Sequence, residues 1–138
     1  MGLTAKELTN LIGETNKVRK ALDRIMDYVD LINKNSDSLP MGTRESLEDV
    51  DGNVSVIGAR VSVIKETLNT ELNKIPVDPG EVKVAADNLL LYHGKTDEVM
   101  NWALTQLRGH EENSYWWNYW KGVCDAVVEK QAQEQQQN

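Results

Sequence analysis

Residues 54–64, VSVIGARVSVI, decide the fold class of this chain, because they fit two incompatible structures. The tetrapeptide VSVI at 54–57 recurs seven residues later at 61–64, and seven residues is the repeat of a helical heptad. The same letters form two β-branched runs around a three-residue loop containing glycine, which is typical of a β-hairpin. The turn-forming residues DGN at 51–53 add to the evidence for the hairpin.

The apolar residues on both sides of this segment favour the helix. A single heptad frame crosses the disputed residues, with apolar side chains at its first and fourth positions, a and d. The members of this frame are Leu47, Val50, Val54, Ile57, Val61, Ile64 and Leu68, and Leu72 and Ile75 extend the apolar face. An interior glycine costs a helix only about 1 kcal/mol, although Gly52 is the expected place for a break. We therefore predict a helix over residues 43–75, with a β-hairpin over 51–64 as the alternative.

A second heptad frame runs through the N-terminal part of the chain. The residues TAKE at 4–7 match a capping box, in which the Thr4 hydroxyl and the Glu7 carboxylate satisfy free amides of the first turn. This start predicts a helix over residues 4–35. Its a and d positions are Leu8, Leu11, Thr15, Val18, Leu22, Ile25, Val29 and Ile32. Ile12 and Met26, at the neighbouring e position, widen the stripe, which suits a helical bundle.

Two further helices are expected in the C-terminal half, over residues 79–108 and 113–130. Asp78 and Pro79 suit an N-cap and a first helical position. One stripe at helical spacing then contains Val82, Ala86, Leu89, His93, Met100, Ala103, Leu104 and Leu107. Gly109 is expected to end that helix as a left-handed cap, and Asn113 or Ser114 to begin the last one. The polar sequence QAQEQQQN at 131–138 predicts a flexible tail.

The fold expected from these patterns is all-α, an elongated antiparallel bundle of about four helices with coiled-coil-like heptad packing. The helices are expected to be antiparallel because short connections favour antiparallel neighbours. We expect the bundle to form a single domain over residues 1–130. A chain of 138 residues can bury roughly two thirds of its unfolded surface without disulfides or metals.

The composition argues against several classes of function. The chain carries 15 Lys and Arg against 22 Asp and Glu, a net charge of −7 with no basic run, so we expect no nucleic-acid binding. No stretch approaches 18 consecutive apolar residues, so we expect no membrane span. The start of the chain lacks a signal-peptide pattern, and the single cysteine cannot form an internal disulfide, so we expect a cytoplasmic protein.

The spacing of reactive residues argues against an enzyme. The sequence contains no HExxH, CxxC or Glu-x-x-His pattern and no phosphate-binding glycine loop, so we expect no catalytic residues, cofactor or metal. Cys124 has no histidine nearby in sequence and is expected to be an inert, partly buried thiol. His93 lies within an apolar stripe, with Asp97 four residues later. It is expected to be a hydrogen-bonded core or boundary histidine, and a ligand or pH-sensing role is the alternative.

The decapeptide NSYWWNYWKG at 113–122 holds three of the four tryptophans. On a helix, Trp116 and Trp120 share a central stripe with two valines, whereas Trp117 lies on a flank. The apolar arc covers about 200°, twice the width of a one-sided surface helix. The cluster is therefore either core alone or core with an interface, and the sequence leaves both open.

The leading functional hypothesis is a non-enzymatic helical protein–protein interaction module: an assembly, adaptor or inhibitor protein, including a viral accessory or structural component. Its partner is another protein or a second copy of the chain. The expected partner-binding residues are Leu91, Trp102, Tyr115, Trp117, Cys124 and Val128. The alternative is a helical bundle that binds a small ligand near the C-terminal tryptophans. The residues of that pocket would include Tyr92, His93 and Trp102.

Overall fold

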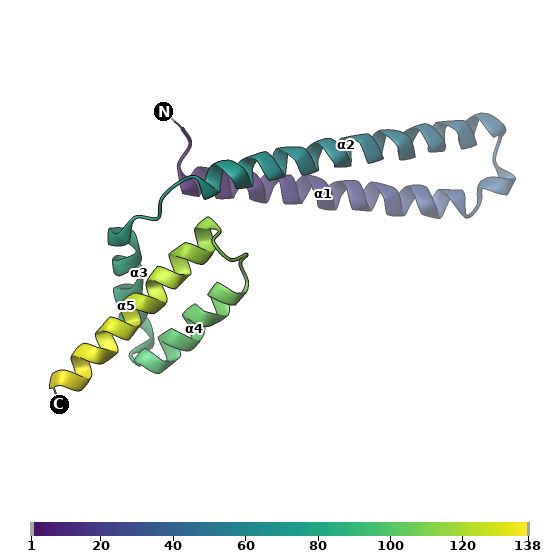
Figure 1. Ribbon diagram of the computed structural model, residues 1–138. Helices are drawn as coiled ribbons and strands as arrows, with labels where there is room; N and C mark the ends of the chain where they lie inside the picture. Colours follow the sequence, from purple (N-terminus) through teal and green to yellow (C-terminus); the bar gives the residue numbers. More distant parts are fainter. Residues whose placement is uncertain (1, 138) are drawn as a thin grey trace. The chain divides into compact units, whose positions relative to one another are not determined.

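The protein is all-helical over residues 2–137, the part of the chain that its computed structural model describes. This range holds five α-helices, one short 3-10 helix and no strand, which confirms the predicted all-α class. The helices, drawn in Figure 1, are α1 (Ala5–Asn33), η1 (Ser36–Ser38), α2 (Met41–Asn73), α3 (Pro79–His93), α4 (Thr96–Arg108) and α5 (Tyr115–Gln137).

The chain divides into two compact units between Leu72 and Asn73. The first contains the helical hairpin of α1 and α2, and the second contains α3, α4 and α5. We refer to them as the hairpin and the three-helix unit. The single domain expected over residues 1–130 stays a prediction.

The disputed residues 51–64 lie inside α2, which runs without a break from Met41 to Asn73. The β-hairpin alternative is therefore wrong, and the helix does not break at Gly52, the place where any break was expected. A Cβ atom added at Gly52 would meet nothing within 4 Å, so packing does not require glycine there. The continuous heptad frame outweighs the cost of about 1 kcal/mol that one interior glycine imposes.

The two helices of the hairpin lie side by side and antiparallel (Figure 1). α1 begins as predicted, because Thr4 Oγ1 accepts a hydrogen bond of 3.1 Å from the Glu7 amide. Across the hairpin, Arg19 Nη1 of α1 donates to the Ser62 hydroxyl of α2 at 3.1 Å and to the Gly58 carbonyl at 3.4 Å. A Cβ atom added at buried Gly58 would lie 3.6 Å from Arg19 Nη1, an ordinary van der Waals distance, so Arg19 packs directly over this glycine.

The helix predicted over residues 79–108 is two helices, so the expected count of about four is too low. Gly94 ends α3 with a positive φ of 75°, and its amide donates to the Leu90 carbonyl at 2.8 Å. This left-handed cap stops a helix, because glycine adopts it without a Cβ penalty. The start of α3 is as predicted, with Asp78 Oδ1 accepting from the Gly80 amide at 2.8 Å. Gly109 ends α4, but its φ of −78° is right-handed, contrary to the prediction.

The last helix begins as predicted and ends later. Ser114 Oγ accepts from the Trp117 amide at 3.3 Å, and Asn113 precedes it with a positive φ of 66°. α5 continues to Gln137, past the expected end near Lys130. The flexibility of residues 131–138 stays a prediction, and Asn138 lies outside the described residues.

The core of the three-helix unit is formed where α3, α4 and α5 meet. Its buried members are Val82, Ala86, Val99, Ala103, Val123, Cys124 and Val127. α3 and α5 approach each other closely at Gly122, where a Cβ atom would lie 2.9 Å from Val82 Cγ1. Because real Cβ contacts are longer than this, the packing of α5 against α3 depends on glycine at position 122.

Candidate interaction surface

The two apolar positions of the α1 heptad differ in exposure. At position a, Leu8, Leu22 and Val29 are buried and Thr15 is half-buried. At position d, the side chains are exposed to nearly the same degree: Leu11 41%, Val18 42%, Ile25 41% and Ile32 44%. α2 therefore covers one side of the predicted α1 stripe and leaves the other side open.

The stripe of α2 shows the same division. Leu47 at position a is buried, and the later a residues Val54, Val61 and Leu68 are half-buried. The d residues are more exposed: Val50 38%, Ile57 46% and Ile64 52%. A coiled coil buries both its a and d positions, so coiled-coil packing of this chain stays a prediction.

The open d positions of both helices lie on one face of the hairpin. Each helix meets the other through its a position and the side of the helix that carries e, as the Arg19, Leu22 and Gly58 contacts show. On a helix, d lies about 60° from a on the side opposite to e. Because the helices are antiparallel, the two d rows come to the same face. We call this set the heptad face: Leu11, Val18, Ile25, Ile32, Val50, Ile57 and Ile64.

The opposite side of the hairpin, which carries the e positions, is hollowed between the helices. Its lining includes Arg19, Leu22 and Met26 of α1 and Val54, Gly58 and Ser62 of α2. The sequence contained a signal for this asymmetry, since the extra apolar residues Ile12 and Met26 both fall at e. They mark the side of α1 that pairs with α2, and hence the d side as the open one.

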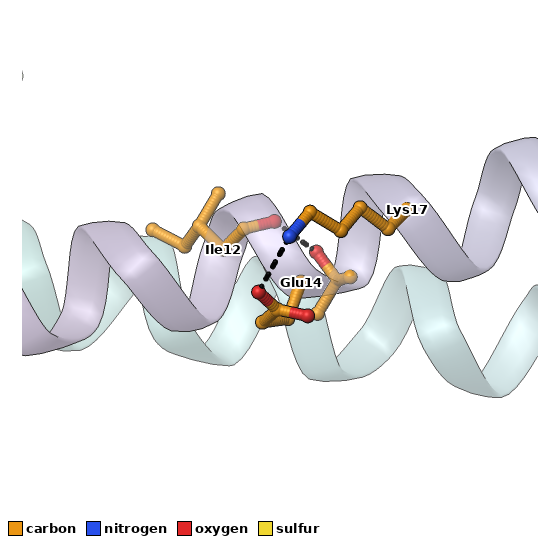
Figure 2. Close-up of polar contacts among 4 residues, drawn as sticks. Ile12, Glu14 and Lys17 are labelled. Carbon is orange, nitrogen blue, oxygen red and sulfur yellow. Dashed lines mark hydrogen bonds and ion pairs between the residues drawn. The ribbon is translucent and has the colours of Figure 1, made fainter.

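Thr15 is the polar member of the α1 stripe. Its hydroxyl and the charged groups beside it find their partners within α1. The Thr15 hydroxyl donates to the Ile12 carbonyl at 2.6 Å, and Lys17 Nζ lies 2.9 Å from Glu14 Oε1 (Figure 2). An exposed ion pair of this kind contributes little to stability. Thr15 therefore needs no hydrogen-bond partner from another helix, and an apolar contact can cover the d residues beside it.

The residues expected to bind a partner in the three-helix unit divide into surface and core. Leu91 is 83% exposed, and Trp102 and Val128 are about half-exposed. Trp117 is half-buried, with Lys121 Nζ 5.3 Å from its ring centroid. The remaining two, Tyr115 and Cys124, are both buried. Cys124 belongs to the core where α3, α4 and α5 meet, and the ring of Tyr115 packs against Trp116, so neither side chain is part of an exposed surface.

The aromatic residues of α5 pack edge to face along the helix. Tyr115 contacts Trp116 with ring centroids 5.0 Å apart, Trp116 contacts Tyr119 at 5.2 Å, and Tyr119 contacts Trp120 at 5.4 Å. Burial raises the pKa of Tyr115 and of Tyr119, and the nearby Glu81 carboxylate raises both further. Tyr119 and Trp120 pack against the buried core, so this part of the cluster has a structural role.

Cys124 and His93 have potentially reactive side chains. The surroundings of the Cys124 thiol make it unreactive, and no assembled site is seen around His93 in the described residues. Burial, with a contribution from Asp125, raises the pKa of the Cys124 thiol, so the thiol stays protonated at neutral pH, in agreement with the expected inert cysteine. His93 is half-buried and meets the exposed Tyr92 ring edge-on at 5.0 Å. Asp97 accepts a hydrogen bond from Gln131 at 3.3 Å. The ligand or pH-sensing role of His93 stays a prediction.

One hollow of the three-helix unit lies along α3 and α5 and has a volume of about 550 Å³. Lys83, Asp87, Asp125 and Lys130 line it, and Lys130 Nζ lies 3.7 Å from Asp87 Oδ1. The predicted pocket residues Tyr92, His93 and Trp102 line neither this hollow nor the one between α1 and α2. Over residues 2–137 no group of three or more potential metal ligands occurs, and no helix combines the length and apolarity needed to cross a membrane.

Comparison of the chain with known protein families, curated protein sequences and solved structures gives no match.

Proposed function

We propose that this protein is a non-enzymatic helical interaction module that binds a protein partner through the heptad face of its hairpin. The observation that carries the proposal is the row of seven aliphatic side chains, each 38–52% exposed, on one side of α1 and α2. Their exposed surface amounts to roughly 600 Å², the upper end of the apolar patches found on monomeric proteins. Patches at this end of the range are often functional.

The small core of the hairpin supports the same proposal. Within α1 the buried residues are Leu8, Leu22 and Val29, and no residue of the hairpin is among the largest fully buried side chains of the described chain. A pair of long helices gains most of its stability from tertiary packing rather than from helix propensity. Covering the heptad face would supply the packing that the two helices do not give each other.

The three-helix unit suits a different task in this proposal. Val99, Val123 and Val127 are completely buried there, so the unit has a core of its own. It would act as a stable anchor or as a second contact point. These two properties are compatible with the broader roles of assembly, adaptor or inhibitor protein, including a viral accessory or structural component.

Site-specific photo-cross-linking in the cell of origin tests the proposal. A photoreactive amino acid at Ile57 of the heptad face should form a cross-link to a protein, identified by mass spectrometry. The matched control is Val63, a similarly exposed aliphatic residue of the same helix, at heptad position c on another side. Equal cross-linking at the two positions, or none at Ile57, would contradict the proposed function.

A further inference from the structure

We propose that the occupant of the heptad face is the heptad face of a second copy of this chain, so that two hairpins form a four-helix bundle. The inference rests on the proposed function and names the partner of that surface. It assigns the d residues of both copies to one shared apolar core.

The area of the face supports a second copy. The seven side chains expose roughly 600 Å² per copy, so face-to-face contact of two copies would bury about 1,200 Å², the lower end of the range for specific interfaces. Neighbouring apolar groups add to this area. Tyr28, at the g position beside the α1 row, is 66% exposed and lies at the outer edge of the face. The interface therefore reaches the size that a stable dimer needs.

The spacing of the face also fits its own copy. Each d row repeats every seven residues, or about 10.5 Å along the helix, and α1 and α2 carry the same repeat. A partner must present two helical rows with that spacing to fill the gaps between successive side chains. A second hairpin has both rows, and a two-fold axis makes such a surface complementary to itself.

The four-helix arrangement explains why the d rows are uniform in exposure while the a rows are not. Residues at a already pack between α1 and α2, whereas residues at d require helices from outside the hairpin. In four-helix bundles, each helix contributes both kinds of position to a common core. Two copies together would complete the heptad packing that one hairpin leaves half-formed.

Light scattering and analytical ultracentrifugation of the full chain test the inference. The protein concentration is varied over about 1–200 µM, a range that brackets the dissociation constants of weak specific dimers. We expect the mass of two copies. The double substitution Ile25→Lys with Ile57→Lys puts one charge on each d row and should weaken dimerisation about a hundredfold or more, as charges in an apolar interface core do. Far-UV circular dichroism of the variant checks that its helices persist.

The matched control is Leu31→Lys with Val63→Lys, which adds the same two charges at position c of the same helices. Leu31 and Val63 are 60% and 61% exposed and lie away from the heptad face, so this variant should keep the dimer mass. A monomeric wild-type chain across the range would overturn the inference, and so would a dimer that survives the d-row lysines or a mass above two copies. A monomer that still cross-links to another protein at Ile57 would overturn the inference alone and leave the proposed function standing.

Discussion

The hairpin and the three-helix unit have similar lengths and similar apolar patterns but differ in what they bury. In the three-helix unit, Val99, Val123 and Val127 have no exposed surface. In α1 of the hairpin the most buried residue is Leu8, at 4%, and alternate members of the same stripe are more than 40% exposed. Two helices cover only one side of each other, whereas a third helix closes a core from all sides.

The difference indicates how the stability of each unit depends on its surroundings. Truncating a side chain of the three-helix core should affect folding directly. Changing a d residue of the hairpin should act mainly through whatever covers the face.

The largest effect is expected from Trp120→Ala in the three-helix unit. Trp120 packs against the buried core, so its loss should lower the free energy of unfolding by about 3 kcal/mol. Trp117→Ala is the control, because this half-buried ring lies outside that core and stacks under Lys121; we expect a loss of about 1 kcal/mol or less. Urea unfolding of the full chain, followed by circular dichroism, measures both. Equal losses would show that the whole aromatic cluster is core.

Two glycine-to-alanine substitutions should have opposite signs in the two units. Gly122→Ala places a Cβ 2.9 Å from Val82 Cγ1, so overpacking should destabilise the three-helix unit by about 1–3 kcal/mol. Gly52→Ala adds a methyl group to an open site in the interior of α2, which should stabilise the hairpin by about 0.5–1 kcal/mol through helix propensity. Thermal unfolding measures both changes. Destabilisation by Gly52→Ala would mean that position 52 is covered in the folded protein.

The smallest effect is expected from alkaline pH on the three-helix unit. Burial raises the pKa of Tyr115 and Tyr119 above their ordinary value of 10.0, so the folded state disfavours the charged forms. The stabilisation is complete below that value and is lost as the pH rises through the raised pKa of each group. The melting temperature should therefore fall above pH 10, and Tyr119→Phe should reduce the fall. A melting temperature unchanged well above pH 10 would contradict the assigned burial.

Local signals account for the parts of the fold that were predicted correctly. The Thr4 side chain caps α1 by accepting from an amide three residues later, and the Asp78 side chain caps α3 by accepting from an amide two residues later. Such caps can be identified from adjacent sequence alone. The heptad frame of α2 resolved the choice between helix and β-hairpin in the same way. The break at Gly94 was missed because an apolar stripe continues across it, although His-Gly-Lys-Thr-Asp contains both a C-cap glycine and a new acidic first turn.

The candidate site was predicted less well than the helices. Leu91, Trp102 and Val128 are at the surface as expected, but Tyr115 and Cys124 are buried. The d residues of α1 and α2 were predicted as core and form the exposed heptad face instead. A periodic pattern shows that a residue requires an apolar neighbour, and it does not show whether that neighbour belongs to the same unit.

The sequence by itself determined which segments are helical, where most of them begin, and which side chains form each apolar stripe, because these depend on contacts within one or two turns. Only the tertiary structure decided how each stripe is used. The close approach of Gly122 to Val82 and the degree to which the d rows are exposed depend on helices distant in sequence. Packing between such helices is set by shape and volume, which the spacing of apolar residues along one helix does not encode.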